Sequence, residues 1–387
     1  MNRTIYLDNN ATTPIDPRVT EAMLPYFKEQ FGNASSSGHS YGWQAADAVK
    51  KARVQVAELI GCKPSEIIFT SGATESNNLA ILGYLFNFLC PTKMSDEVPH
   101  FITSEIEHKA VYEVGERLKD WGCEVTFLKP DQYGMITPEQ VSQALQPNTK
   151  LVSIMWANNE IGTINPVKEI AQQCKENGVL FHTDAAQAAG KVNIDLASTD
   201  IDLLSLSAHK IYGPKGIGAL YVREKQPELK ITPFTVGGAQ EKGIRPGTLN
   251  VPGIVGLGVA CQICKDEGKE DEQRLSTLQK KLIDTVLTEC PGSQLNGHPS
   301  QRLYNNISLS FSQVTPDDFP LGLSGLALSS GSACSSQAAG PSYVLKGIGL
   351  SDELASSAIR IGLGRFTTEE DVDTAIGKIL KMHKKSA

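Results

Sequence analysis

The strongest constraint on the fold is a regular alternation of short apolar runs with helical patterns along the first 260 or so residues. A strand that is apolar at every position has both faces covered, and strands that alternate with helices form mostly parallel sheets. We therefore predict an α/β fold with a mostly parallel central sheet and helices on both faces. The runs that predict strands are residues 67–70, 100–103, 124–128, 151–155, 179–182, 203–206 and 218–222.

The pattern changes after about residue 262, where a charged helix over 266–289 is followed by a strand-like stretch at 305–311. A chain of 387 residues is long for a single core. We therefore predict a large domain over 15–261. Residues 1–14 and 262–387 are assigned to a smaller α+β domain.

The charge of the chain argues against binding to nucleic acid or to a membrane surface. The formal net charge is −7 and no long basic run occurs, so we expect neither nucleic acid nor a membrane surface as a partner. The first residues lack the apolar core of a secretory signal, and the most apolar stretch, 79–90, is too short to span a bilayer. We expect a cytoplasmic protein.

Eight cysteines are scattered along the chain, at positions 62, 90, 123, 174, 261, 264, 290 and 334. Without a secretory signal this distribution predicts reduced thiols rather than disulfides. Cys261 and Cys264 form a C-x-x-C pair, a spacing that also occurs in zinc and redox sites. No second pair or histidine cluster accompanies them, and 255–265 has a helical pattern, so we expect helical thiols and no metal site.

Polar segments follow several predicted strands, at the edge where open α/β sheets bind their ligands. Residues 70–75 combine a strand end, a glycine and a helix start, which suits a phosphate but also fits a plain helix cap. Asp184 ends another apolar strand and needs a partner there, either a protonated ring nitrogen or the next helix.

Two further side chains have nucleophilic potential. Lys210 follows a strand and precedes a Pro/Gly loop, so burial would free its amine for Schiff-base chemistry, although most lysines are surface residues. Cys334 lies in the Ser/Gly run 329–336, which indicates either a thiol on a mobile arm or a plain linker. Asp184 and Lys210, 26 residues apart, together fit a site for pyridoxal 5'-phosphate, in which the lysine binds the aldehyde and the acid keeps the ring protonated.

Seven segments resemble the cysteine desulfurases, in particular the group I, NifS/IscS-like branch of the fold type I pyridoxal-phosphate enzymes. The resemblance covers nearly the whole chain in the expected order. The segments are residues 6–14, 70–75, 107–110, 158–162, 182–187, 205–216 and 329–335.

The resemblance implies roles for individual residues. Lys210 would carry the cofactor and move the substrate's α proton, Asp184 would pair with the pyridine nitrogen, and Gln187 would contact the phenolic oxygen. His108 would stack on the ring and act as an acid or base, and Cys334 would attack the substrate sulfur. The implied phosphate ligands are Ala73, Thr74, Ser207, His209 and, from a second subunit, Thr248. Asn158 and Arg360 would bind the substrate carboxylate, with Asn158 also beside the cofactor.

The implied reaction converts L-cysteine to L-alanine and a persulfide on Cys334. The resemblance also implies a homodimer and a sulfur acceptor protein such as an iron–sulfur scaffold. A selenocysteine or cystine lyase of the same fold is an alternative, as is a non-catalytic scaffold. Lys210, Asp184, His108 and Cys334 together argue against the scaffold.

Overall fold

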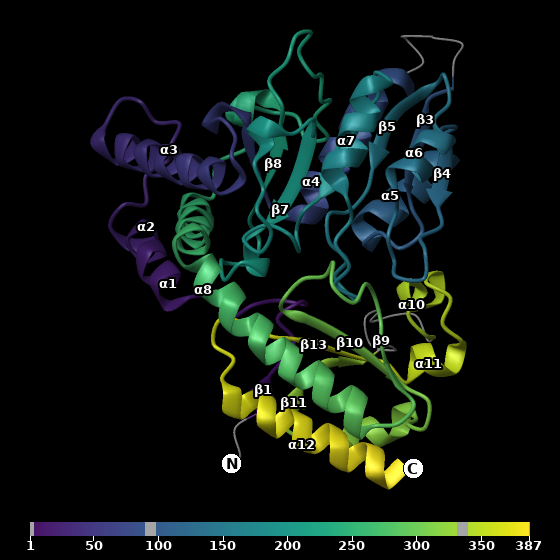
Figure 1. The fold of residues 1–387 in the computed structure, drawn as a ribbon. Helices are drawn as coiled ribbons and strands as arrows, with labels where there is room; N and C mark the ends of the chain where they lie inside the picture. The colour runs from purple at the N-terminus through teal and green to yellow at the C-terminus, as the bar shows by residue number, and fades with distance from the viewer. Residues whose placement is uncertain (1–3, 90–97, 331–339, 387) are drawn as a thin grey trace.

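The computed structural model describes residues 4–89, 98–330 and 340–386. Its centre is a seven-stranded sheet (Figure 1) in which β8 alone runs antiparallel to both of its neighbours. The prediction of a mostly parallel sheet is confirmed. In spatial order the strands are β2 (Ile67–Thr70), β8 (Gly218–Val222), β7 (Leu203–Ser207), β6 (Leu180–Asp184), β5 (Thr149–Ser153), β3 (His100–Ser104) and β4 (Glu124–Leu128).

Helices cover both faces of this sheet, which explains why its strands are apolar at successive positions. Neighbouring strand residues point to opposite faces. Phe101 packs in one cluster with side chains of α4 (Ala73–Leu89) and α5 (Lys109–Asp120). Ile102 packs on the other face, in the cluster that contains side chains of α3, α6, α7 and α8. The bounds of the first three are Ser40–Ile60, Pro138–Ala144 and Val167–Glu176.

Helix α8 (Val251–Glu289) is one continuous helix of 39 residues, where the sequence pattern suggested two helical stretches. Leu257 in its first half packs in the cluster around the central sheet, whereas Leu282 in its second half packs in a different cluster. The change from apolar to charged residues near 262 therefore reflects a change of surroundings along one helix. The division into two domains at this position stays a prediction.

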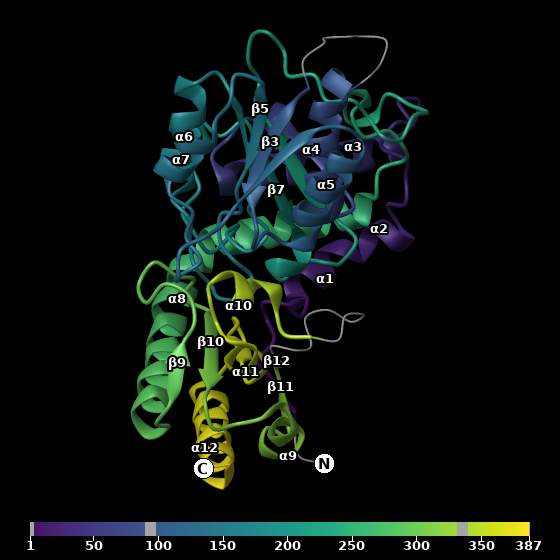
Figure 2. The same cartoon turned by 90° about the vertical axis from the view of Figure 1, so that its right-hand side faces the viewer.

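The second cluster forms around a four-stranded antiparallel sheet below the central one (Figures 1 and 2). Helix α12 (Glu369–Ser386) packs in this cluster together with Leu7, because β1 (Ile5–Tyr6) pairs with β11 (Leu326–Ala327). The start of the described chain thus lies beside its C-terminal elements. The strands of the sheet are β12 (Ser329–Ser330), β13 (Ile359–Gly362), β10 (Asn306–Phe311) and β9 (Ser293–Leu295), in that order.

Five short helices complete the α-helices of the described residues. They are α1 (Pro17–Met23), α2 (Pro25–Lys28), α9 (Phe319–Gly322), α10 (Tyr343–Gly347) and α11 (Asp352–Ser356). Among the described residues, the helices are all too short or too polar to cross a membrane.

Candidate active site

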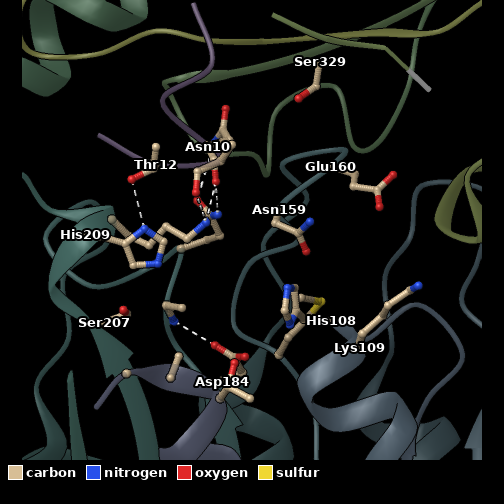
Figure 3. A pocket seen from close by; sticks show the side chains of 18 of the residues that line it. Asn10, Thr12, His108, Lys109, Asn159, Glu160, Asp184, Ser207, His209 and Ser329 are labelled. Carbon is tan, nitrogen blue, oxygen red and sulfur yellow. Dashed lines mark hydrogen bonds between the residues drawn. The ribbon is translucent and has the colours of Figure 1, made fainter. Parts of the chain in front are cut away.

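A cavity of about 970 Å³ lies where β6 and β7 end, next to the start of α4. Figure 3 shows Asp184 at one end of it and Ser329 at the other, with His209 and His108 on opposite sides. The structure brings together most of the residues that the sequence singled out. Those that line the cavity are Ala73, Thr74, His108, Asp184, Gln187, Ser207, His209, Lys210 and Arg360.

The start of α4 is arranged to bind an anion. β2 ends at Thr70 and α4 begins at Ala73, so unpaired helix amides face this corner of the cavity. Glu75 also lines the cavity, but its carboxylate accepts from the Ser71 amide at 2.6 Å and pairs with Arg245 Nε at 2.9 Å. The arginine offsets a charge that would otherwise repel a phosphate.

Asp184 ends β6 and is almost completely buried. Its Oδ2 accepts from Asn77 Nδ2 at 2.7 Å, and its Oδ1 accepts from the Ala186 amide at 2.9 Å. These two donors orient the carboxylate and leave lone pairs for a third donor in the cavity, such as a protonated ring nitrogen. Asn77 was not predicted from the sequence, where its only signal was its place one turn into α4.

Lys210 follows β7, and its Nζ donates to the main-chain oxygens of Asn10 and Ala11, each at 2.7 Å. Burial, with help from the cations Arg360 and Lys191, lowers the pKa of this amine to about 8. A neutral amine, the form that attacks an aldehyde, is therefore accessible near neutral pH.

Two histidines flank this lysine and aspartate. His209 Nδ1 lies 3.1 Å from Thr12 Oγ1 (Figure 3), and burial together with the Lys210 cation lowers the pKa of His209 to about 4. His108 caps α5, since its Nδ1 accepts from the Ala110 amide at 3.1 Å, and burial lowers its pKa as well. Both rings are therefore neutral at pH 7.

On the side of the cavity opposite Asp184, strand β13 contributes a cation, Arg360. Arg360 Nη2 donates to Asp8 Oδ1 at 2.9 Å and to Ser329 Oγ at 2.8 Å, and Nη1 donates to the Asn159 main-chain oxygen at 3.3 Å. These contacts fix a guanidinium that faces the cavity, where it can bind a carboxylate. Asp8, Asn159 and Ser329 were not singled out as ligand-contacting residues by the sequence.

The structure does not bring Asn158 into the cavity, contrary to what the resemblance implied. Its side chain is completely buried and bonds to nearby main chain: Nδ2 donates to the Ile106 oxygen at 3.1 Å, and Oδ1 accepts from the Glu160 and Ile161 amides at 2.8 and 3.1 Å. These hydrogen bonds satisfy the side-chain amide of Asn158 and fix the conformation of its loop. Its neighbour Asn159 lines the cavity instead (Figure 3).

The remaining predicted residues lie elsewhere. Thr248 is exposed and is not among the residues that line the cavity of its own chain. Cys334 lies outside the described residues. Cys261 and Cys264 are buried in α8 with no disulfide, and burial raises the pKa of both thiols.

Comparison with known proteins identifies the family. Residues 5–374 match the family model for class-V aminotransferases. The chain is 50% identical over 375 residues to a protein of Rickettsia africae named cysteine desulfurase IscS, covering 97% of this chain and 90% of the relative. A solved NifS-like protein superposes with a TM-score of 0.89 at 36% identity, covering 99% of this chain and all of the other.

A second solved structure, of SspA in complex with cysteine, has a TM-score of 0.82 at 38% identity and covers 94% of this chain and all of the other. The cofactor of this family is pyridoxal phosphate, and the cavity fits it. Lys210 offers an amine, Asp184 an acid for the ring nitrogen, and the start of α4 an anion site. The chain therefore belongs to the class-V aminotransferases and, within them, to the pyridoxal-phosphate-dependent cysteine desulfurases.

Proposed function

We propose that this protein takes sulfur from L-cysteine, releases L-alanine and holds the sulfur as a persulfide on Cys334. The observation that carries the proposal is the joint placement in one cavity of the Lys210 amine, the Asp184 carboxylate and the Arg360 guanidinium. The SspA relative was solved with cysteine bound, which supports cysteine as the substrate here.

Bound pyridoxal phosphate supplies an aldehyde for amines and a protonated ring that takes up electrons when the substrate's α proton leaves. Asp184, held by Asn77, would keep a proton on the ring nitrogen. The amides at the start of α4 would hold the phosphate, with Ser207 and His209 beside them. Lys210 accepts the α proton, because its pKa of about 8 leaves part of its amine neutral at pH 7.

Arg360 orients the substrate. Its Nη2 already donates to Asp8 and Ser329, so an incoming carboxylate adds to a guanidinium that is held in place rather than free to move. The substrate thiol is proposed to face the side of the cavity formed by Ser329 and residues 340–343, which flank the segment that contains Cys334.

Cys334 is the proposed sulfur acceptor. Described residues lie on both sides of it in the chain. Two of them, Ser329 before it and Gly340 after it, line the cavity. The buried thiols of Cys261 and Cys264 are poor alternatives, because burial raises their pKa values and disfavours the reactive thiolate.

We also propose a homodimer in which Thr248 of each chain reaches the phosphate in the cavity of the other. Thr248 is exposed and does not line the cavity of its own chain, which leaves it available to a partner. Four exposed aromatic side chains, Phe27, Phe31, Tyr41 and Trp43, provide apolar surface for such an association. Light scattering that finds an active monomer at micromolar concentration would contradict the dimer.

The sulfur acceptor downstream is proposed to be an iron–sulfur scaffold protein, and the location to be cytoplasmic. The support for both is the sequence resemblance. Transfer of labelled sulfur from Cys334 to a purified scaffold would test the first, and fractionation of the source cells would test the second.

The proposed reaction is tested by incubating the protein with L-cysteine and a reducing thiol while measuring alanine and sulfide. The unchanged protein should release the two in equal amounts. A Cys334→Ser variant should keep its cofactor and bind cysteine but release no sulfide. The matched control is the double variant Cys261→Ser/Cys264→Ser, which should remain active. Loss of transfer in the double variant, but not in Cys334→Ser, would make the C-x-x-C pair the acceptor.

A further inference from the structure

A second lysine, Lys191, contacts the main chain of Lys210. Lys191 lies in the turn after β6, and its Nζ donates to the main-chain oxygen of Lys210 at 3.1 Å and to that of Gln187 at 3.2 Å. Lys210 and Gln187 both line the cavity, on the segments that follow β7 and β6. One amine therefore joins the two loops that carry cavity residues.

The position of Lys191 also places a charge near the Lys210 amine. The cations around that amine are Arg360 and Lys191, and the nearby acids are Asp184 and Asp8. His209 and His108 also interact with Lys210, but both rings are neutral at pH 7. Burial lowers the pKa of Lys191 itself to about 8, so this amine is mostly protonated at pH 7, and its charge disfavours the protonated form of Lys210.

We propose that Lys191 is a positioning residue for Lys210: it fixes the main chain of Lys210 against the Gln187 segment and keeps a positive charge beside the Lys210 amine. The proposal rests on the proposed role of Lys210. A lysine that only stabilised the two loops would affect unfolding but would leave the titration of Lys210 unchanged.

Two substitutions separate the charge from the hydrogen bonds. Lys191→Gln removes the charge and keeps an N–H donor, whereas Lys191→Arg keeps the charge. In cofactor-free protein, the rate at which an amine-selective acylating reagent modifies Lys210 is measured across pH by mass spectrometry of its peptide. The midpoint should lie near 8 in the unchanged protein and in Lys191→Arg. In Lys191→Gln it should rise by about one pH unit, because one nearby cation is lost.

A second readout is the uptake of the cofactor. The rate at which added pyridoxal phosphate bonds to the cofactor-free protein at pH 7, followed by absorbance, should fall about tenfold in Lys191→Gln, in step with the smaller neutral fraction of Lys210. Lys191→Arg should restore the rate. Lys191→Met provides a second neutral variant if the glutamine variant does not fold.

The control is Lys215→Gln, which removes an exposed lysine at the edge of the same cavity. Its midpoint should match that of the unchanged protein. An unmoved midpoint in Lys191→Gln, or an equal rise in Lys215→Gln, overturns the proposal. Cofactor bonded to a lysine other than Lys210 would instead overturn the proposed function, so the two failures are distinguishable.

Discussion

The two sides of the cavity are built in different ways. On the sheet side, Asp184 ends strand β6 and Lys210 lies shortly after the end of strand β7, so the central sheet sets their separation. On the opposite side, Arg360 is held by Asp8, 352 residues away in the chain, and by Ser329. We therefore propose a division of labour, in which the sheet side carries the chemistry and the opposite side orients the substrate.

The largest expected effect lies on the sheet side. Asp184→Asn should still take up cofactor but lose turnover about a hundredfold or more, because a neutral amide no longer holds the ring nitrogen protonated. Steady-state kinetics and the absorption spectrum check both statements. Unchanged turnover would show that Asp184 has no role in the reaction.

Arg360→Gln tests the opposite side. We expect KM for cysteine to rise about tenfold to a hundredfold with a smaller change in kcat, since a charge-assisted hydrogen bond contributes about 1.5–3 kcal/mol. Arg117→Gln, at an exposed arginine on α5, is the matched control. A fall in kcat at constant KM would contradict the division of labour.

A smaller effect is expected for Asn77→Ala, which removes one of the two donors that orient Asp184. Turnover should fall about tenfold, the lower end of the range for a hydrogen bond to a charged group, with KM nearly constant. If KM rises and kcat does not change, Asn77 acts on the substrate and not through Asp184.

Asn158→Ala should have the smallest effect on catalysis. Its buried amide shapes the loop, so the free energy of unfolding in urea should fall by about 1–3 kcal/mol while KM stays close to its original value. The paired variant Asn159→Ala should change KM more than Asn158→Ala does. A raised KM with undiminished stability in Asn158→Ala would indicate instead that Asn158 binds the substrate.

The same contrast explains what could be predicted from the sequence. The strand that ends at Asp184 and the strand that precedes Lys210 both begin with apolar residues and end in polar ones, so their ends and the sheet-side groups could be placed from local pattern. The contact of Asp8 with Arg360 joins opposite ends of the chain and leaves no local signal.

Two other features were beyond local pattern. Asn158 and Asn159 are adjacent residues of the same type. Only the folded loop determines that Asn158 is buried and that Asn159 lines the cavity. Helix α8 passes from one hydrophobic cluster to another, so its residue composition changes although its backbone stays helical throughout. Neither case could be settled from residue types, because tertiary contacts determine both.

The most direct test of the account is to locate the covalent bond to the cofactor. The purified protein is reduced with borohydride, digested, and its peptides are mapped for the label. We predict that the label lies on Lys210 alone and is absent from a Lys210→Ala variant, because the buried amine of Lys210 lies with Asp184 in the cavity. A label on Lys215, Lys191 or any other lysine would contradict the account.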